Sequence, residues 1–236
     1  MDQNGDDQSA PLTRVAYDKV ARVYDWLGWL YTGGQIARLK QRQSATLEPN
    51  ARVLYAGIGT GEELVSALAV GARPTALDAS SVMLDRARRR VGALPARSLA
   101  GSRAEHVRFC CEDFFAHSAA EPYDMVVANF FLNVFAESML PRAIARLSDL
   151  LRPGGTLLIG DFAPPVGHPA LCILQRAYYL PPLALFRLLT HNPWHRLYDY
   201  RPVAERAGFT LEAHDRVRIF GLGPRWLSTL RFVKGA

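Results

Sequence analysis

The residues best suited to chemistry lie in a glycine-rich segment and in the short stretch that follows it. Three alternate glycines come directly after an apolar run: Gly57, Gly59 and Gly61. Such glycines permit a tight turn and let a ligand approach the backbone, and a following helix offers unpaired N–H groups to a polar ligand. Asp78 lies about 20 residues further on, at the end of the next apolar run, where a carboxylate can accept from ribose hydroxyls. The segment predicts a nucleoside-binding site, and a glycine turn without a ligand is the alternative.

The glycine pattern also restricts the class of ligand. A dinucleotide fingerprint needs a third glycine where this chain has Glu62, and a glutamate beside a pyrophosphate would repel it. A Walker-type phosphate loop is excluded because no G-K-[ST] follows. A ligand without phosphates, such as S-adenosylmethionine, avoids both conflicts.

Short apolar runs alternate with amphipathic segments and predict the elements that position these residues. The predicted strands are 52–56, 74–77, 107–111, 123–128, 156–160, 209–216 and 227–233. The predicted helices are 14–47 with a break at Gly33-Gly34, 62–70, 80–91, 138–151 and 202–207. Strands alternating with helices favour a parallel sheet covered on both faces, and continuous apolar strands fit that burial. We therefore expect an α/β, doubly wound, mostly parallel seven-stranded sheet.

The remaining segments define the expected domain organisation. Residues 1–12 are polar and acidic without an apolar signal core, and we expect a disordered lead-in. Residues 13–236 are interpreted as one domain, with a helical cap formed by 13–47 and by the aromatic- and proline-rich insert 163–200. The most apolar stretch, 171–189, contains two arginines and a proline pair, which argues against a transmembrane span.

Composition limits the partners. The chain has 236 residues, 49% hydrophobic and 21% charged, with a formal net charge of +6. This mild basic excess permits peripheral membrane contact or an anionic partner without demanding either. Cys110 and Cys111 are adjacent and point to opposite faces of a strand, so a disulfide between them is not expected and a reducing, cytoplasmic location fits. The cysteine and histidine spacings match no zinc motif, so we expect no metal.

Several motifs taken together resemble one family. VLYAGIGTG, TALDASSVML, CEDFF with YDMVVANFFLNVF, and LLRPGGTLLIGDF are similar to the motifs of class I S-adenosylmethionine-dependent methyltransferases. An N-terminal YDKVARVYD is similar to the first helix of the ubiquinone/menaquinone-biosynthesis C-methyltransferase-like group. The resemblance covers residues 13–162, and more loosely extends to 216. It implies a Rossmann-like fold and S-adenosyl-L-methionine as the cofactor.

The resemblance also implies roles for individual residues. Those implied to contact the cofactor are Tyr24, Tyr55, Gly57, Gly59, Gly61, Asp78, Ala79, Met83, Asp113, Phe114 and Asn129. Asp78 would bind the ribose hydroxyls, Asp113 the adenine amino group and Asn129 the methionine portion. Met83 is equally suited to a core, and Asp113 to capping the next turn.

Position 55 departs from the family pattern. The family usually has an acid there, two residues before the first glycine, which helps to bind the cofactor's amino group. Tyr55 offers only a phenol, which is neutral at pH 7. Glu62 or Glu63 could compensate, although a helix start also favours glutamate for its own sake.

The predicted substrate side is rich in aromatic residues. Segments that follow the carboxyl ends of the strands carry Phe130, Phe131, Phe135, Phe162, Tyr178, Tyr179, Phe186, Trp194, Tyr198 and Tyr200. Such a lining predicts a small, rather apolar acceptor, resembling a quinone, phenol or polyketide and methylated at carbon or oxygen. Deprotonating the acceptor requires a base, and His195 with Tyr198 is the preferred substrate-side pair.

Two alternatives to small-molecule methylation remain open. A nucleic-acid methyltransferase would account for the arginines at 86, 88, 89 and 90, although a solvated helix face accounts for them as well. Phe-Phe-Leu after Asn129 lacks the proline-aromatic signature of base amino methylation, and this argues against nucleic acid. The other alternative is a protein that binds S-adenosylmethionine through the same fold without catalysis.

Overall fold

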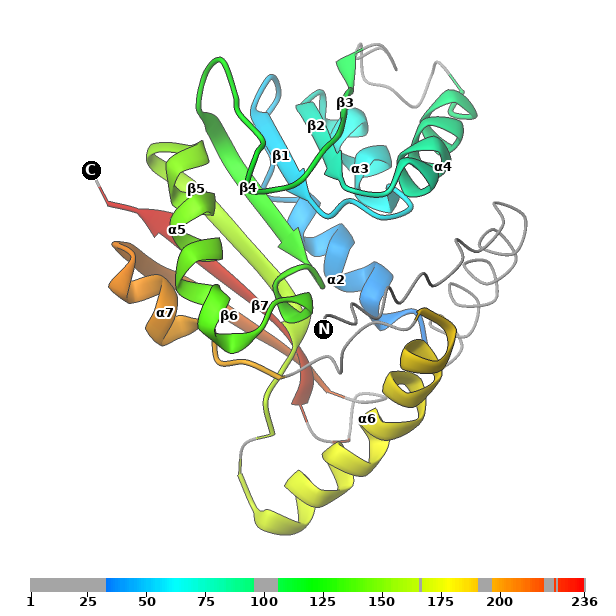
Figure 1. Ribbon diagram of the computed structural model, residues 1–236, viewed down its shortest axis with the longest axis vertical. Coiled ribbons are helices and arrows are strands. Elements are labelled where there is room, and N and C mark those ends of the chain that lie inside the picture. The colour runs from blue at the N-terminus through cyan, green and yellow to red at the C-terminus, as the bar shows by residue number, and fades with distance from the viewer. Residues whose placement is uncertain are drawn as a thin grey trace, which may run out of the picture.

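A twisted sheet forms the centre of the molecule (Figure 1). The computed structural model describes residues 33–95, 106–165, 167–190, 197–218, 223 and 225–235. The strand order is β3-β2-β1-β4-β5-β7-β6, with β7 antiparallel to β5 and β6 and the other pairs parallel. The strands are β1 (Arg52–Ala56), β2 (Arg73–Asp78), β3 (Arg108–Cys111), β4 (Tyr123–Asn129), β5 (Leu151–Phe162), β6 (Phe209–Arg218) and β7 (Arg225–Lys234). The predicted fold class is confirmed.

Helices cover both faces of the sheet. They are α2 (Gln35–Ser44), α3 (Glu62–Val70), α4 (Ser81–Gly92), α5 (Leu140–Leu150), α6 (Pro169–Thr190) and α7 (Arg201–Arg206), with 3₁₀ turns at Leu132–Val134 and Glu137–Met139. One core layer joins α3 and α4 to the sheet, and the other joins α5 and α7 to the opposite face. Neighbouring strand residues such as Val53 and Leu54 are both fully buried, one in each layer. Burial on both faces explains why the strand sequences are continuously apolar.

The segment after α5 differs from the expected turn. The sequence predicts that Arg152–Gly155 turn the chain before a strand at 156–160. In the structure β5 already begins at Leu151, which pairs with Tyr123, and the pairing register shifts before Met125 meets Thr156. Gly154 has φ +69° within this bulge, a conformation that glycine adopts without strain. The turn residues are therefore accommodated as an irregularity inside a longer strand.

The described part of the insert lies on the carboxyl edge of the parallel strands. Here β1, β4 and β5 end and the antiparallel β7 begins. Tyr179 of α6 donates its hydroxyl to the carbonyls of Ala163 and Trp226, 2.9 and 2.8 Å away. The rings of Phe162 and Trp226 pack against the Tyr179 ring, and Tyr178 packs on Trp226. The predicted lead-in 1–12, and residues 13–32, 166 and 191–196 of the predicted cap, fall outside the described part of the chain.

No helix in the described ranges combines the length and the apolar character that a membrane crossing requires.

Candidate active site

The glycine loop turns sharply between β1 and α3. Gly57, Gly59 and Gly61 all have positive φ, at 67°, 57° and 74°. The amides of Gly57 and Ile58 both donate to the carbonyl of Leu77 and so hold the loop against the end of β2. A side chain at Gly57 would collide with the Phe131 ring, and one at Gly61 would meet Ala87 Cβ at 2.6 Å. The loop therefore needs glycine for its backbone conformation and at two positions for space as well.

Asp78 holds the middle of this loop. Its carboxylate accepts from the amide of Gly59 and from the amide of Ser80, each at 2.9 Å. Ser80 is the N-cap of α4 and accepts from the amide of Met83. These bonds fix the carboxylate beside the loop, and its remaining lone pairs can accept from a ligand. Ala79 is exposed next to it, and Met83 is half-buried in the first turn of α4.

Arg90 supports the loop from α4. Its guanidinium donates to the carbonyl and to the hydroxyl of Thr60, at 3.0 and 3.2 Å. Elsewhere in the arginine row, Arg88 pairs with Asp85 and lies over the Phe109 ring. These two members of the row make local contacts and so contribute less to a free basic surface.

The segment after β3 presents a capped turn and an aromatic cluster. Asp113 accepts from the amide of Phe115 at 2.7 Å, the capping arrangement that was the alternative to an adenine contact. Phe114 is buried, with its ring centroid 5.1 Å from that of Phe131 in an edge-to-face contact. Phe131 in turn lies over Gly57. The aromatic cluster therefore reaches the glycine loop.

Four polar side chains meet at the carboxyl ends of β1 and β4, and we call them the α2 cluster: Lys40, Gln43, Glu63 and Asn129. Gln43 and Asn129 exchange two side-chain hydrogen bonds, of 2.9 and 2.8 Å. Asn129 also donates to Glu63 at 3.3 Å, and the Lys40 ammonium lies 3.0 Å from the same carboxylate. The cluster connects α2, α3 and β4. Of its members, the sequence analysis identified Asn129 and offered Glu63 only as one of two possible compensating acids.

The charges in this cluster are strongly buried. Glu63 is 5% exposed, and its second carboxylate oxygen is buried without a hydrogen-bond partner among the described residues. Burial opposes the charge of Lys40, but Glu63 and Glu62 outweigh it and raise the pKa of Lys40. Tyr55 is 3% exposed, and burial together with the Glu63 charge raises its pKa well above the usual value. Tyr55 is therefore a neutral phenol, and the buried acid beside it is Glu63.

The predicted substrate-side residues are described only in part. His195 lies outside the described residues, as does Tyr24 on the cofactor side. Tyr198 is 8% exposed and donates its hydroxyl to the carbonyl of Phe135 at 3.0 Å. It also lines an open cavity of about 430 Å³ beside the start of α5.

A buried acid that the sequence analysis missed lies near the end of β5. Asp161 accepts from Tyr200, Asn133 and the amide of Phe162, at 2.5, 2.8 and 2.7 Å. Burial raises the pKa of Asp161 to about 6, although these hydrogen bonds oppose the rise. The partners are up to 39 residues apart in the chain, so no local pattern indicates the pairing.

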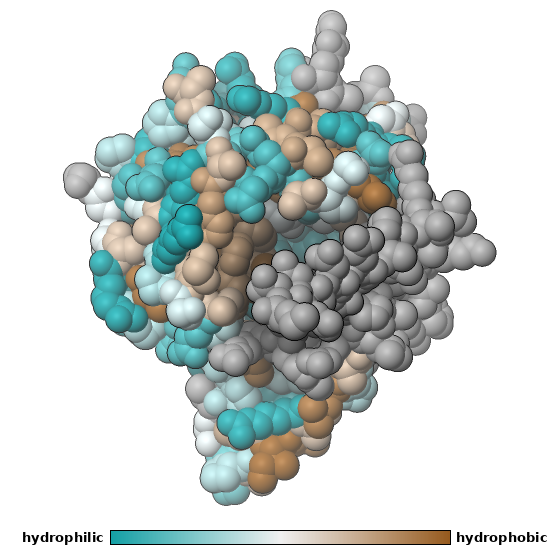
Figure 2. All heavy atoms as spheres, viewed as in Figure 1, coloured by the Kyte–Doolittle hydropathy of each residue, from teal (hydrophilic) through white to brown (hydrophobic). Residues whose placement is uncertain are grey.

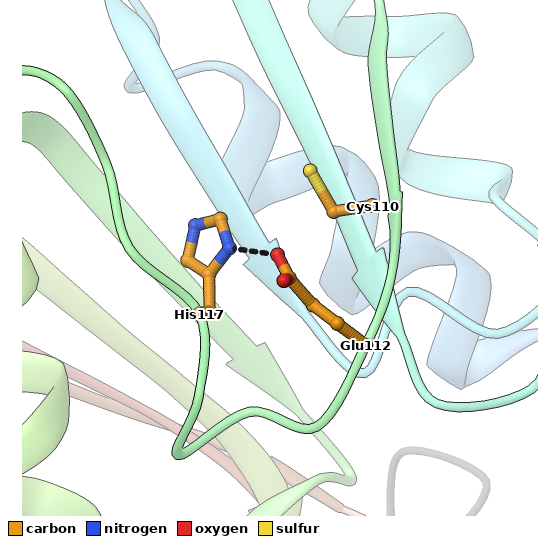
Figure 3. Close-up of side chains that lie close together, drawn as sticks. All are labelled: Cys110, Glu112 and His117. Atoms are coloured by element: carbon orange, nitrogen blue, oxygen red, sulfur yellow. Dashed lines mark hydrogen bonds and ion pairs between the residues drawn. The ribbon is translucent and has the colours of Figure 1, made fainter.

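A second polar group lies beneath β3 (Figure 3). Donor atoms of Cys110, Glu112 and His117 all lie within 4.8 Å of one another, close enough for a metal ion. In the structure, however, both His117 ring nitrogens are engaged, one with Glu112 at 2.7 Å and the other with the Tyr123 hydroxyl at 3.1 Å. Burial raises the pKa of the Cys110 thiol, which disfavours a thiolate ligand. The arrangement is that of a hydrogen-bond network around the buried His117, with Glu112 exposed at its edge.

Comparison with known proteins agrees with this geometry. The Methyltransferase domain family matches residues 29–214, most of the chain. The chain belongs to this family.

Three known proteins are similar to this chain in sequence or in structure. Ubiquinone/menaquinone biosynthesis C-methyltransferase UbiE of Syntrophotalea carbinolica is 31% identical over 170 residues, covering 70% of this chain and 67% of that protein. Probable thiol methyltransferase 2 of Arabidopsis thaliana is 31% identical over 110 residues, covering 47% of this chain, which spans under half (46%) of that protein. The glycopeptide N-methyltransferase MtfA, solved with S-adenosyl-L-methionine, is 17% identical, with a TM-score of 0.56 over 83% of this chain and 86% of that one.

The residues present fit S-adenosylmethionine, the ligand with which MtfA was solved. The glycine loop leaves open space beside Gly59, and Asp78 is fixed next to it. Glu63 adds a buried negative charge at the same edge of the sheet, with one oxygen that has no partner among the described residues. The predicted cofactor and enzyme class are confirmed.

Proposed function

We propose that this methyltransferase transfers the methyl group of S-adenosylmethionine to a small, rather apolar acceptor at carbon or oxygen. The observation that carries the proposal is the meeting of the glycine loop, Asp78 and the α2 cluster with an aromatic group at one edge of the sheet. The cofactor supplies an electrophilic methyl carbon, and the acceptor bonds to that carbon while the carbon–sulfur electron pair stays on sulfur. The acceptor proton passes to a base or to water.

For the cofactor, the chain's residues divide into two groups. We assign the ribose hydroxyls to Asp78, with Ala79, Met83, Asp113 and Phe114 on the adenine side. The bonds from Gly59 and Ser80 support the first assignment because they hold the Asp78 carboxylate in place before any ligand arrives.

The α2 cluster is assigned to the methionine portion. Glu63 takes the role that an acid at position 55 plays in the family, because Tyr55 is neutral and buried next to it. The Lys40 ammonium lies 3.0 Å from Oε1 of the Glu63 carboxylate. As a cation, it suits the carboxylate of a ligand. Asn129, bonded to Gln43, donates to Glu63 and orients its carboxylate.

The acceptor is assigned to the aromatic group beyond these residues. Phe131 lies over Gly57 and packs with Phe114 and Phe135. Apolar walls exclude water and favour an apolar acceptor. The name of the Syntrophotalea carbinolica relative, which specifies ubiquinone/menaquinone biosynthesis, supports the same class.

The alternatives predict different outcomes. A nucleic-acid methyltransferase needs a basic surface, and the local contacts of Arg88 and Arg90 weaken that support. A binding protein without catalysis would take up the cofactor and form no methylated product.

The test is incubation with isotopically labelled S-adenosylmethionine and an acceptor panel of quinols, phenols, thiols and RNA, with product identified by mass spectrometry. Label in a quinol or phenol supports the proposal, and label in RNA or thiols alone contradicts it. Binding without any product favours the non-catalytic alternative.

A further inference from the structure

The outer face of α6 is apolar along several turns. Ile173, Leu174 and Leu180 are 68%, 57% and 56% exposed, and Leu171 is 49% exposed. Ala170, Ala177, Pro181 and Ala184 are also exposed and extend the same face. The spacing 170, 173, 174, 177, 180, 181 and 184 follows the helical period, so these positions form one continuous stripe. Figure 2 shows apolar side chains gathered over α6 at the lower tip of the molecule.

The inner face of α6 is firmly attached. Gln175 donates to the carbonyl of Ala163 at 3.0 Å and to Tyr179, whose hydroxyl bonds to the carbonyls of Ala163 and Trp226. Gln175 and Tyr179 are each 2% exposed. The helix therefore holds one fixed face toward the sheet, and the apolar stripe points outward as a consequence of that attachment.

The charge around the stripe is positive. The 22 residues of α6 include no Asp or Glu, and Arg176 is exposed at the border of the stripe. Arg218 and Arg225, both exposed, are cross-strand neighbours in β6 and β7 beside Trp226, on the inner side of α6, and add positive charge to the same end of the molecule. An apolar stripe with basic residues at its border is typical of helices that lie in the plane of a membrane interface.

We infer that the α6 stripe docks onto an anionic lipid bilayer. The stripe enters the boundary between headgroups and acyl chains while Arg176, at its border, meets lipid phosphates. A continuous exposed apolar face is unfavourable in water and is relieved by such insertion. The docking inference depends only on the surface of α6 and is independent of the proposed function. A consequence for the substrate rests on the proposed function, since α6 lies on the same edge of the sheet and docking would bring that edge to a lipid-dissolved acceptor.

The test is flotation of the full chain with vesicles of phosphatidylcholine, with and without phosphatidylglycerol. Ile173→Asp/Leu180→Asp places two charges in the stripe, and because both side chains are exposed the fold should persist. The matched control is Val134→Asp, another exposed apolar position at 42% exposure, outside α6. Arg176→Gln tests the charge, with Arg89→Gln on α4 as its control. Calorimetry with S-adenosylmethionine reports separately on the fold and the cofactor site.

We expect the wild type to float with the anionic vesicles. The double variant should lower the vesicle partition coefficient at least tenfold, and Arg176→Gln should lower it about fivefold. Both control variants should partition like the wild type, and cofactor affinity should be unchanged throughout. Absence of binding to anionic vesicles would overturn the inference, as would equal partitioning of the double variant. The inference would also be overturned if the wild type were a dimer that does not bind vesicles and that the Ile173→Asp/Leu180→Asp substitutions dissociate. A wild type that floats but fails to bind the cofactor would overturn the proposed function and leave the docking intact.

Discussion

Replacing Glu63 by Gln tests whether Glu63 binds the cofactor's ammonium in place of an acid at position 55. Glu63 is 5% exposed, receives a bond from Asn129 at 3.3 Å and lies 3.0 Å from the Lys40 ammonium. Glutamine keeps the size of the side chain and removes the charge. If the carboxylate holds the cofactor's ammonium, the loss of one charge-assisted hydrogen bond costs about 1.5–3 kcal/mol. That energy corresponds to a rise in the dissociation constant of about tenfold to a hundredfold.

The same substitution also affects stability, and a matched control separates the two effects. Breaking a fully buried ion pair costs about 3–5 kcal/mol. Here the cost should be smaller, because the Lys40 side chain is 18% exposed and keeps Glu62 at 3.4 Å. Glu62→Gln removes a 44% exposed carboxylate from the same lysine and should change affinity little. The assay is calorimetric titration of each folded variant with S-adenosylmethionine. Equal affinity of Glu63→Gln and wild type would refute the reasoning.

A double variant tests whether the acid can be moved back. Tyr55→Asp alone places a second carboxylate beside Glu63 in a buried site, and like charges there should lower the free energy of unfolding. Tyr55→Asp combined with Glu63→Leu restores a single acid and should recover both stability and cofactor affinity relative to either single variant. Additive losses in the double variant, measured by chemical denaturation and titration, would show that the two positions do not share one role.

Three further predictions follow from particular contacts. Arg90→Gln removes both bonds to Thr60 and should weaken cofactor binding several-fold by calorimetry, whereas Arg89→Gln should not; equal effects would contradict a supporting role for Arg90. Because the pKa of Asp161 rises from 3.8 unfolded to about 6 folded, the folded state holds its proton longer, so the group's contribution to stability is lost as pH rises through that window. The free energy of unfolding of Asp161→Asn, relative to that of the wild type, should therefore rise by up to about 3 kcal/mol between pH 4 and 7 in urea denaturation. A difference that stays constant over this pH range would contradict the prediction. For the network beneath β3, a chelator should leave the melting temperature unchanged while His117→Leu lowers it by several degrees; stoichiometric zinc lost together with stability would instead identify Cys110 as a ligand.

Local patterns predicted those elements whose formation depends on local signals. The strand at 52–56 and the helix at 62–70 have the predicted boundaries, because an apolar run ends in glycines and two glutamates start the helix. The predicted start of the strand after α5 was wrong, because pairing with β4 extends this strand through glycines that locally favour a turn.

The contacts of the candidate site also differ in how far local sequence predicts them. Asp78 and the glycines lie within one strand-loop-helix-strand unit, so their spacing predicts that they meet, and they do. Gln43 and Asn129 are 86 residues apart, and Lys40 reaches Glu63 from a different helix. Their contacts depend on how α2 lies on the sheet, which no periodicity in either segment reveals. The replacement of an acid by Tyr55 was visible in the sequence, whereas choosing Glu63 over Glu62 required their burial.

Cofactor binding at the glycine loop is tested most directly by titrating the wild type and Asp78→Asn with S-adenosylmethionine. Asparagine keeps the shape and one acceptor oxygen, so the loop bond from Gly59 or Ser80 can persist while the charge is lost. Asp85→Asn, an acid on the neighbouring helix α4 that pairs with Arg88, is the control. The wild type and the control should bind with equal affinity, and Asp78→Asn should bind at least tenfold more weakly with an unchanged fold. Equal affinity of all three proteins would show that the cofactor does not bind where the glycine loop meets Asp78.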